Sequence, residues 1–496
     1  MSGIRVTYSG LISFVVGLAS VFTGIIFTII VTRQLTPEEF GTWNLIGGLI
    51  VYAVIIEPTI SYWVTREVAR EKESGKTAVF FSGVFSIGGV IVYLIIAYFI
   101  AQNTDAEQSI LFVGAILIPL MFLNRTLTAL NLGWKPHAVS YGKLFFEIFK
   151  IPAALIIVYL MDMGIEGAII STAIAYVASI VILFISSRTK LHGLIELFYL
   201  KKWLKLSWLP LYPGIASMIY VLDVSMFALI TGSVEGLAFW SAAVAVGALA
   251  LHSKAISSAI YPKLLEGGKM EYLQKNLRLV LYFSIPLSAL SITFAKPALF
   301  ALNPIYIVAV PVVIMLTLRG FSENIKFLFM SAIKGMETVD VNENSSFKDY
   351  LKSKLILIPT VILIQYSLYI VTLVLILVIF NSKTQLELVM YWSVTSVIIS
   401  IPFTIYFYYL SRRRFKFKIN YFAITKYVII STGIFGLIYF LMEEYLIFYE
   451  SIFEFLPHLL LFVALGVGGY LFISYFTDRN TKNLVKSIFS EIKNKK

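Results

Sequence analysis

Long apolar stretches alternate with short polar segments along the whole chain of 496 residues. A helix needs about 20 mostly apolar residues to cross a bilayer core, because each backbone N–H must be bonded within the segment. By that measure the pattern predicts an all-α membrane protein with fourteen spans. The predicted spans are 9–31, 41–64, 78–101, 109–131, 140–161, 165–186, 206–230, 234–261, 277–300, 305–332, 355–380, 386–410, 424–442 and 457–476.

The composition of the chain supports this interpretation. Hydrophobic residues make up 59% of the chain and charged residues only 14%, whereas a soluble domain carries roughly a quarter charged residues. The net charge of +12 comes from short basic clusters between apolar runs, so we expect no nucleic-acid partner. The absence of Cys excludes disulfides and thiolate metal sites, and we expect neither a metal nor a cofactor.

The charges of the loops predict the orientation. If the N-terminus lies inside, the loops on that side carry 32 Lys and Arg residues, Arg125 among them, whereas the opposite loops carry Arg33 and Lys383 only. Basic loops remain on the cytoplasmic side. We therefore expect a multi-pass protein of the cell membrane, monomeric, with both termini in the cytoplasm.

The chain is predicted to contain two related halves. A shift of 197 residues aligns residues 36–50 with 233–247, placing Glu38 on Glu235 and Trp43 on Trp240. Two six-helix lobes in a pseudo-two-fold arrangement, followed by two further helices, would explain this repeat. The predicted domains are an N-terminal lobe 1–188, an amphipathic linker 189–205, a C-terminal lobe 206–410, spans thirteen and fourteen in 411–478 and a basic cytoplasmic tail 479–496.

The linker and residues 482–493 set apolar residues against Lys on a helical period. This pattern predicts helices that lie in the plane of the lipid headgroups.

Charged residues inside the predicted spans are candidates for function, because a charge in the bilayer is costly. The cations at such positions are Lys143, Lys150, Lys254, Lys296, Arg319 and Lys326. The acids are Glu57, Glu147, Asp223 and Glu323, of which Glu57 and Asp223 are candidates for ion coupling. Lys254 fits a functional role and an anchoring role equally well, and Lys296 near an outer span end fits snorkelling.

Two spans repeat a cation, an acid and a cation at i, i+4 and i+7: Lys143, Glu147 and Lys150, then Arg319, Glu323 and Lys326. Residues so spaced share one face of a helix. A cavity lined in this way could receive a phosphate or pyrophosphate group. The alternative is that these charges are salt bridges between helices, or that the Lys side chains snorkel toward the cytoplasm.

No Walker loop, HExxH, GxSxG or aspartate-rich metal motif occurs, so we do not expect an enzyme.

Three segments carry a family resemblance: 31-VTRQLTPEEFGTWNLI-46, 163-MGIEGAIISTAIAYVAS-179 and 223-DVSMFALITGSVEGLAFWSAA-243. They resemble polysaccharide-biosynthesis flippases of the multidrug, oligosaccharidyl-lipid and polysaccharide (MOP) exporter superfamily. The matching positions of the first segment are Arg33, Leu35, Pro37, Glu39, Phe40, Gly41 and Trp43, and Asp223 matches the acid of the third. The turn between spans eleven and twelve departs from the family pattern, and Ala238 replaces an expected glycine.

The resemblance implies alternating access between two lobes that move a lipid-linked glycan, carried on an undecaprenyl or dolichyl phosphate, to the outer leaflet. It implies a lipid-linked glycan and the bilayer as partners, with glycan-assembly membrane enzymes as possible neighbours. Arg33 becomes a candidate cavity residue near the outer gate, the alternative being an arginine at the membrane edge.

Three other functions stay open. A multidrug exporter of the same superfamily would call for more buried acids than cations, whereas here the cations outnumber the acids. A membrane glycosyltransferase or polymerase would need catalytic carboxylates on a larger extramembrane segment. A major-facilitator sugar transporter would need a signature that the loop after span two lacks.

Overall fold

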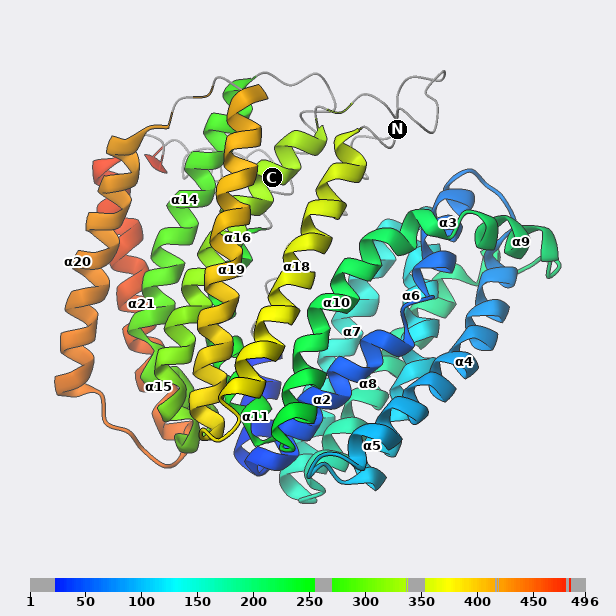
Figure 1. The fold of residues 1–496 in the computed structure, drawn as a ribbon, viewed down its shortest axis with the longest axis horizontal. Coiled ribbons are helices and arrows are strands. Elements are labelled where there is room, and N and C mark those ends of the chain that lie inside the picture. Colours follow the sequence, from blue (N-terminus) through cyan, green and yellow to red (C-terminus); the bar gives the residue numbers. More distant parts are fainter. Residues whose placement is uncertain are drawn as a thin grey trace, which may run out of the picture. The chain divides into compact units, whose positions relative to one another are not determined.

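The computed structural model describes residues 23–254, 270–335, 337, 353–414, 417, 419–478 and 481–482. Every regular element in these residues is helical, which confirms the all-α prediction (Figure 1). The start of the first predicted span, the end of the eighth and most of the basic tail lie outside the described residues, as does the predicted helix 482–493 beyond Lys482.

In the described residues, eleven helical segments are long and apolar enough to cross a membrane. They are α4 (Gly75–Ala101), α5 with α6 (Gln108–Val113 and Leu117–Trp134), α8 (Gly164–Ser187), α10 (Trp208–Thr231), α11 (Glu235–Gly247) with a 3-10 extension, α14 (Met270–Thr293), α16 (Val310–Gly335) with the 3-10 turn before it, α18 (Lys354–Ile379), α19 (Gln385–Arg414), α20 (Tyr421–Tyr445) and α21 (Ile452–Thr477). A bent pair, α2 (Pro37–Ala53) and α3 (Pro58–Ala69), supplies a twelfth.

Two predicted spans remain outside this set. The first is described only as the short apolar helix Thr23–Gln34. The other is α7 (Pro136–Ala154), which continues as a π-helix to Leu160 and contains the charged stripe of the sequence.

The predicted span 277–300 is wrong in its limits. The helix α14 begins earlier, at Met270, and ends at Thr293, and a short helix α15 (Ala295–Leu302) follows. Phe294 separates them because its backbone, with φ −93° and ψ 9°, leaves the helical conformation. Apolar composition continues through this break, so hydropathy alone could not locate it.

Two helices are interrupted at matching positions of the predicted repeat. The pair α2 and α3 bends by 63°, where Pro58 begins the second helix. In the other half, α11 gives way to the 3-10 helix Ala248–Ser253. Under the shift of 197 residues, Glu57 at the first break falls on Lys254, directly after the second. Because no sequence identity is involved in this match, it supports the internal repeat independently.

The chain forms two compact units: unit 1 comprises Met1–Ser241 and Ile362–Val389, and unit 2 comprises Ala242–Val361 and Met390–Lys496. Unit 1 includes α10, which runs beside α2 (Figure 1). The predicted lobe boundaries follow the repeat, and they stay predictions.

The predicted linker contains a helix, α9 (Leu197–Lys205), that packs against α3 and α4 within unit 1. Trp203 is fully buried against a cluster that includes Val64 and Leu130. Its indole Nε1 donates to Glu67 Oε2 at 3.1 Å, and Lys202 Nζ lies 2.8 Å from Glu67 Oε1. The other face exposes large apolar side chains, Phe198 at 66%. This amphipathic face fits the predicted place of the linker in the headgroup plane.

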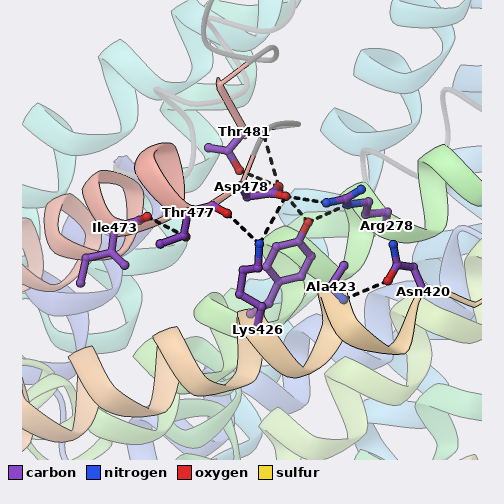
Figure 2. A network of polar contacts seen from close by, with 9 residues as sticks. Arg278, Asn420, Ala423, Lys426, Ile473, Thr477, Asp478 and Thr481 are labelled. Atoms are coloured by element: carbon purple, nitrogen blue, oxygen red, sulfur yellow. Dashed lines mark hydrogen bonds and ion pairs between the residues drawn. The ribbon is translucent and has the colours of Figure 1, made fainter.

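In unit 2, one carboxylate ties α14, α20 and α21 together (Figure 2). Asp478 Oδ1 is 2.5 Å from Arg278 Nη2, and Tyr427 Oη donates to Asp478 Oδ2 at 3.2 Å. Lys426 Nζ donates to the carbonyl of Thr477 at 2.7 Å, which caps the end of α21. These contacts fix the two appended helices to the rest of the unit.

We predict that Trp203→Ala destabilises the protein by about 3–5 kcal/mol, because a large buried side chain is lost and Glu67 loses a donor. Lys201→Ala is the matched control, because Lys201 is an exposed residue of the same helix and its loss should change stability by about 0.5 kcal/mol or less. The measurement is the midpoint of thermal aggregation of the purified protein. Equal midpoints for the two variants would show that α9 is not held through Trp203.

Candidate functional site

The first charged stripe contains a buried ion pair in unit 1. On α7, Lys150 Nζ lies 3.4 Å from Glu147 Oε2, and the two side chains are 12% and 10% exposed. Thr23 Oγ1 donates to the same carboxylate at 2.8 Å. The ammonium group also lies 4.7 Å from the centre of the Phe27 ring and 5.2 Å from that of Phe146. Glu147 and two aromatic rings therefore compensate the positive charge of Lys150, which is largely shielded from solvent.

Lys143 behaves differently from Lys150. It is exposed, and no ion pair among the described residues joins it to Glu147. The sequence places both lysines on one face of the helix. In the structure the acid pairs with the lysine three residues after it, which leaves the first lysine of the stripe accessible.

A second polar group in unit 1 involves α3, α6 and α8. Glu57, 3% exposed at the start of α3, accepts a hydrogen bond from Ser61. Arg125 of α6 acts electrostatically on Glu57 and on Tyr176 of α8. The ring of Tyr176 packs edge-on against Phe146, with centroids 4.9 Å apart. Because Phe146 also contacts Lys150, the two polar groups adjoin each other.

Arg125 requires a correction. The charge pattern predicts a cytoplasmic loop position for Arg125, but the residue lies inside α6, well before that helix ends at Trp134. Arg125 lies within the predicted span 109–131, so the sequence itself indicated that this arginine is not in a loop. Removing one cation from the loop count leaves the predicted orientation unchanged.

Asp223, the other coupling candidate, is buried in α10 and hydrogen-bonded. Its Oδ2 accepts from Tyr369 Oη at 2.8 Å, and its Oδ1 accepts from the Val224 N–H at 2.8 Å. The Tyr220 ring stacks on Tyr369 with centroids 5.9 Å apart. These contacts hold the carboxylate in place, and its role in coupling stays a prediction.

The second stripe has the same construction in unit 2. On α16, Lys326 Nζ lies 2.5 Å from Glu323 Oε1, and the Lys326 side chain is 4% exposed. Ser400 Oγ of α19 donates to the same carboxylate oxygen at 2.8 Å. In both units, a glutamate forms an ion pair with the lysine three residues later and accepts a hydrogen bond from a hydroxyl group of another helix.

The remaining candidates are placed less centrally. Arg319 is half-buried on α16, one turn before Glu323. Lys254 is exposed, and its Nζ lies 4.4 Å from the centre of the Phe327 ring. Arg33 is half-buried near the end of the helix Thr23–Gln34.

A buried amide positions α16 against the interrupted eighth span. Asn324 Nδ2 donates to the Ala250 carbonyl at 2.6 Å and to Ser253 Oγ at 2.8 Å. The 3-10 backbone at Ala248–Ser253 makes this carbonyl available. The amide thus holds the break that immediately precedes Lys254.

Each stripe offers amine or guanidinium donors and retains a net positive charge, because one acid accompanies two cations. Such donors suit the oxygens of a phosphate or pyrophosphate. No group of three or more His, Asp and Glu residues within the described ranges is arranged to hold a metal ion.

Sequence reasoning missed the partners of the charges. Thr23, Ser400, Phe146 and Tyr176 lie in spans full of hydroxyl and aromatic residues, and no periodic pattern distinguishes them. They become recognisable only once the helices are packed.

No protein-family model and no curated protein sequence matches this chain. Solved structures do. The lipid II flippase MurJ, in an inward closed conformation, matches with a TM-score of 0.65 at 14% identity, covering 95% of this chain and 99% of MurJ. An inward-facing multidrug resistance MATE family transporter of the MOP superfamily matches with a TM-score of 0.56 at 15% identity, covering 82% of this chain and 95% of its own.

A third match is a MOP superfamily transporter from Pyrococcus furiosus Vc1, for which the reverse polarity of the binding pocket suggests a different function. Its TM-score is 0.52 at 13% identity, over 83% of this chain and 95% of its own. At these identities the likeness is one of fold. It agrees with the resemblance found in the three sequence segments, and the chain has the fold of the MOP superfamily transporters.

Proposed function

We propose that this protein is a flippase that moves a lipid-phosphate- or lipid-pyrophosphate-linked oligosaccharide or polysaccharide precursor across the membrane by alternating access. The observation that carries the proposal is the excess of cations inside the spans, organised in each unit around a buried Glu–Lys pair. The cell membrane is its expected location, with both termini in the cytoplasm, and it acts as a monomer that receives cargo from glycan-assembly enzymes.

The cargo follows from the sign of the buried charge. A cation kept in a bilayer costs free energy, and the acids present offset only part of it. A phosphate or pyrophosphate headgroup supplies the missing negative charge and accepts hydrogen bonds from Lys and Arg. In unit 1 we assign headgroup contact to the exposed Lys143 and Arg125, and in unit 2 to the half-buried Arg319.

The fold neighbours support this reasoning. MurJ is a lipid II flippase, so the fold can serve a lipid-linked cargo. In the Pyrococcus furiosus transporter, a reversed pocket polarity suggests a different function from its relatives. Charge sign is therefore a reasonable criterion for choosing among the cargoes that this fold carries.

A multidrug exporter is the second candidate, favoured by the buried acids Glu57 and Asp223 and by the MATE fold neighbours. Buried acids suit cationic drugs and ion coupling. Both of these acids are engaged, by Ser61 and Tyr369 respectively, whereas the two Glu–Lys pairs leave each stripe positive. A membrane glycosyltransferase or polymerase is less favoured, because the described outer loops are short.

The proposal is tested in proteoliposomes that contain a fluorescent polyisoprenyl-pyrophosphate saccharide. Protein-dependent access of the saccharide to an impermeant reagent in the outer solution supports the flippase. Transport of a cationic dye without saccharide movement would favour the drug exporter, and new glycosidic bonds would favour the enzyme.

We predict that Lys143→Gln together with Arg319→Gln abolishes saccharide movement without loss of a monodisperse protein, because each unit loses a cation that we assign to headgroup contact. The matched control is Lys383→Gln. Lys383 is 45% exposed and pairs only weakly with Glu387, at 3.7 Å. Wild-type transport by the double variant would remove the stripes from the mechanism.

We also predict that Arg125→Gln lowers the transport rate by about tenfold or more, the scale expected for losing one hydrogen bond to a charged group. Arg125→Lys should recover part of the rate, because the charge is retained but the planar fork is lost. The control Arg413→Gln changes an exposed arginine at the end of α19. If Arg125 is only a surface cation, the two glutamine variants will transport equally.

A further inference from the structure

A turn that joins α10 to α11 is held by a single carboxylate from the loop after α4. Asp105 Oδ2 accepts from Ser233 Oγ at 2.7 Å, and Asp105 Oδ1 accepts from the Val234 N–H at 2.8 Å. The Asp105 N–H also donates to the Gly232 carbonyl at 3.1 Å. Three bonds between two loops more than a hundred residues apart in sequence make this a specific contact.

The beginning of α2 closes on the same turn. A Cβ at Gly41 would collide with the carbonyl of Val234, so only glycine permits this approach. Asn44 Nδ2 reaches the Leu237 carbonyl at 3.5 Å. Farther along α2, Tyr52 Oη lies 3.3 Å from Ser225 Oγ of α10. Direct contacts thus connect α2 of the first predicted lobe with α10 and the start of α11 of the second, and all of these residues belong to unit 1.

The segments that meet here are the two that the repeat relates, 36–50 and 233–247. Related segments from two halves meet where their pseudo-symmetry axis passes, and in a rocking transporter the contact on that axis must open. Both segments lie at span ends predicted to be on the outer side, opposite the basic loops.

The contact also contains like charges. Glu38 and Glu235 correspond under the repeat shift. The negative charges of Glu38 and Asp105 both repel the carboxylate of Glu235. Repulsion among these carboxylates opposes the hydrogen bonds of Asp105. Asp105 and Glu38 are exposed, so water can replace the bonds when they break. Such a contact is suited to opening and closing.

We infer that Asp105 and the turn at Gly232–Glu235 form a latch that closes the outer end of the transport path, and that repulsion between Glu38 and Glu235 makes the latch reversible. Asp105 is a positioning residue, because it acts through its hydrogen bonds to the turn. The inference rests on the alternating access of the proposed function. For release of cargo, the Asp105 bonds to Ser233 and Val234 must break.

The absence of Cys allows two spin labels to be placed without removing native thiols. We place them at Gln102, in the loop of the first half, and at Lys383, in the turn between α18 and α19. The distance distribution between the labels is measured by double electron–electron resonance in nanodiscs, without cargo. This reads the state of the outer end directly.

Ser233→Ala removes one hydrogen bond of Asp105 without changing the charge. We expect it to raise the ratio of longer to shorter distances between the spin labels by about threefold or more, because losing one hydrogen bond shifts the populations modestly. Asp105→Ala should raise it further in the same direction. Glu38→Gln with Glu235→Gln should lower the ratio, because it removes repulsion and keeps the bonds. Glu107→Gln, an exposed acid near Asp105 in sequence, is the matched control and should leave it unchanged.

Opposite signs for the two groups of variants support the latch. The inference is overturned if Ser233→Ala and Asp105→Ala match the wild type, or if the glutamine pair shifts the distances in the same direction as they do. Monodispersity of each variant excludes misfolding, and Ser233→Ala remains informative if Asp105→Ala does not fold. Because no saccharide is present, failure of the proposed cargo in the transport assay would leave this result standing.

Discussion

A charge placed inside a bilayer must be compensated within the protein, and this requirement organises the structure around two Glu–Lys pairs. In each unit the glutamate forms an ion pair with the lysine three residues later. It also accepts a hydrogen bond from a hydroxyl group of a different helix, that of Thr23 in unit 1 and that of Ser400 in unit 2. A lone lysine at these positions would carry a large desolvation cost. Each Glu–Lys pair therefore depends on the packing of a neighbouring helix, which supplies the hydroxyl group that completes it.

The same requirement favours an anionic cargo. Each stripe contains one acid for two cations, so pairing uses up the acid and leaves positive charge on the helix. Arg125 adds a further cation in unit 1, close to Glu57 and Tyr176. The breaks in the second helix of each half lie near these charges: Glu57 at one break and Lys254 at the other. Irregular backbone at membrane depth is tolerated where it is buried in protein or lines a water-filled path.

Much of the fold could be predicted because apolar length is a strong signal in a membrane protein. The helix boundary at Phe294 could not, since it lies in continuous apolar sequence. The break at Glu57 had a signal in the following Pro58, which apolar length alone does not use. The stripes were predictable from spacing on one helix face. Their pairing was not, because the choice between Lys143 and Lys150 as the partner of Glu147 depends on Thr23 and Phe27 from another helix. Arg125 shows the limit of loop counting, which treats any cation near a span end as extramembrane.

The central claim is that positive charge in the spans selects a phosphate-bearing lipid. Native mass spectrometry of the purified protein with an equimolar mixture of a polyisoprenyl pyrophosphate and the corresponding uncharged polyisoprenol tests it most directly. We expect a stoichiometric complex with the pyrophosphate and none with the alcohol. Equal binding of the two lipids, or preference for the alcohol, would contradict the claim.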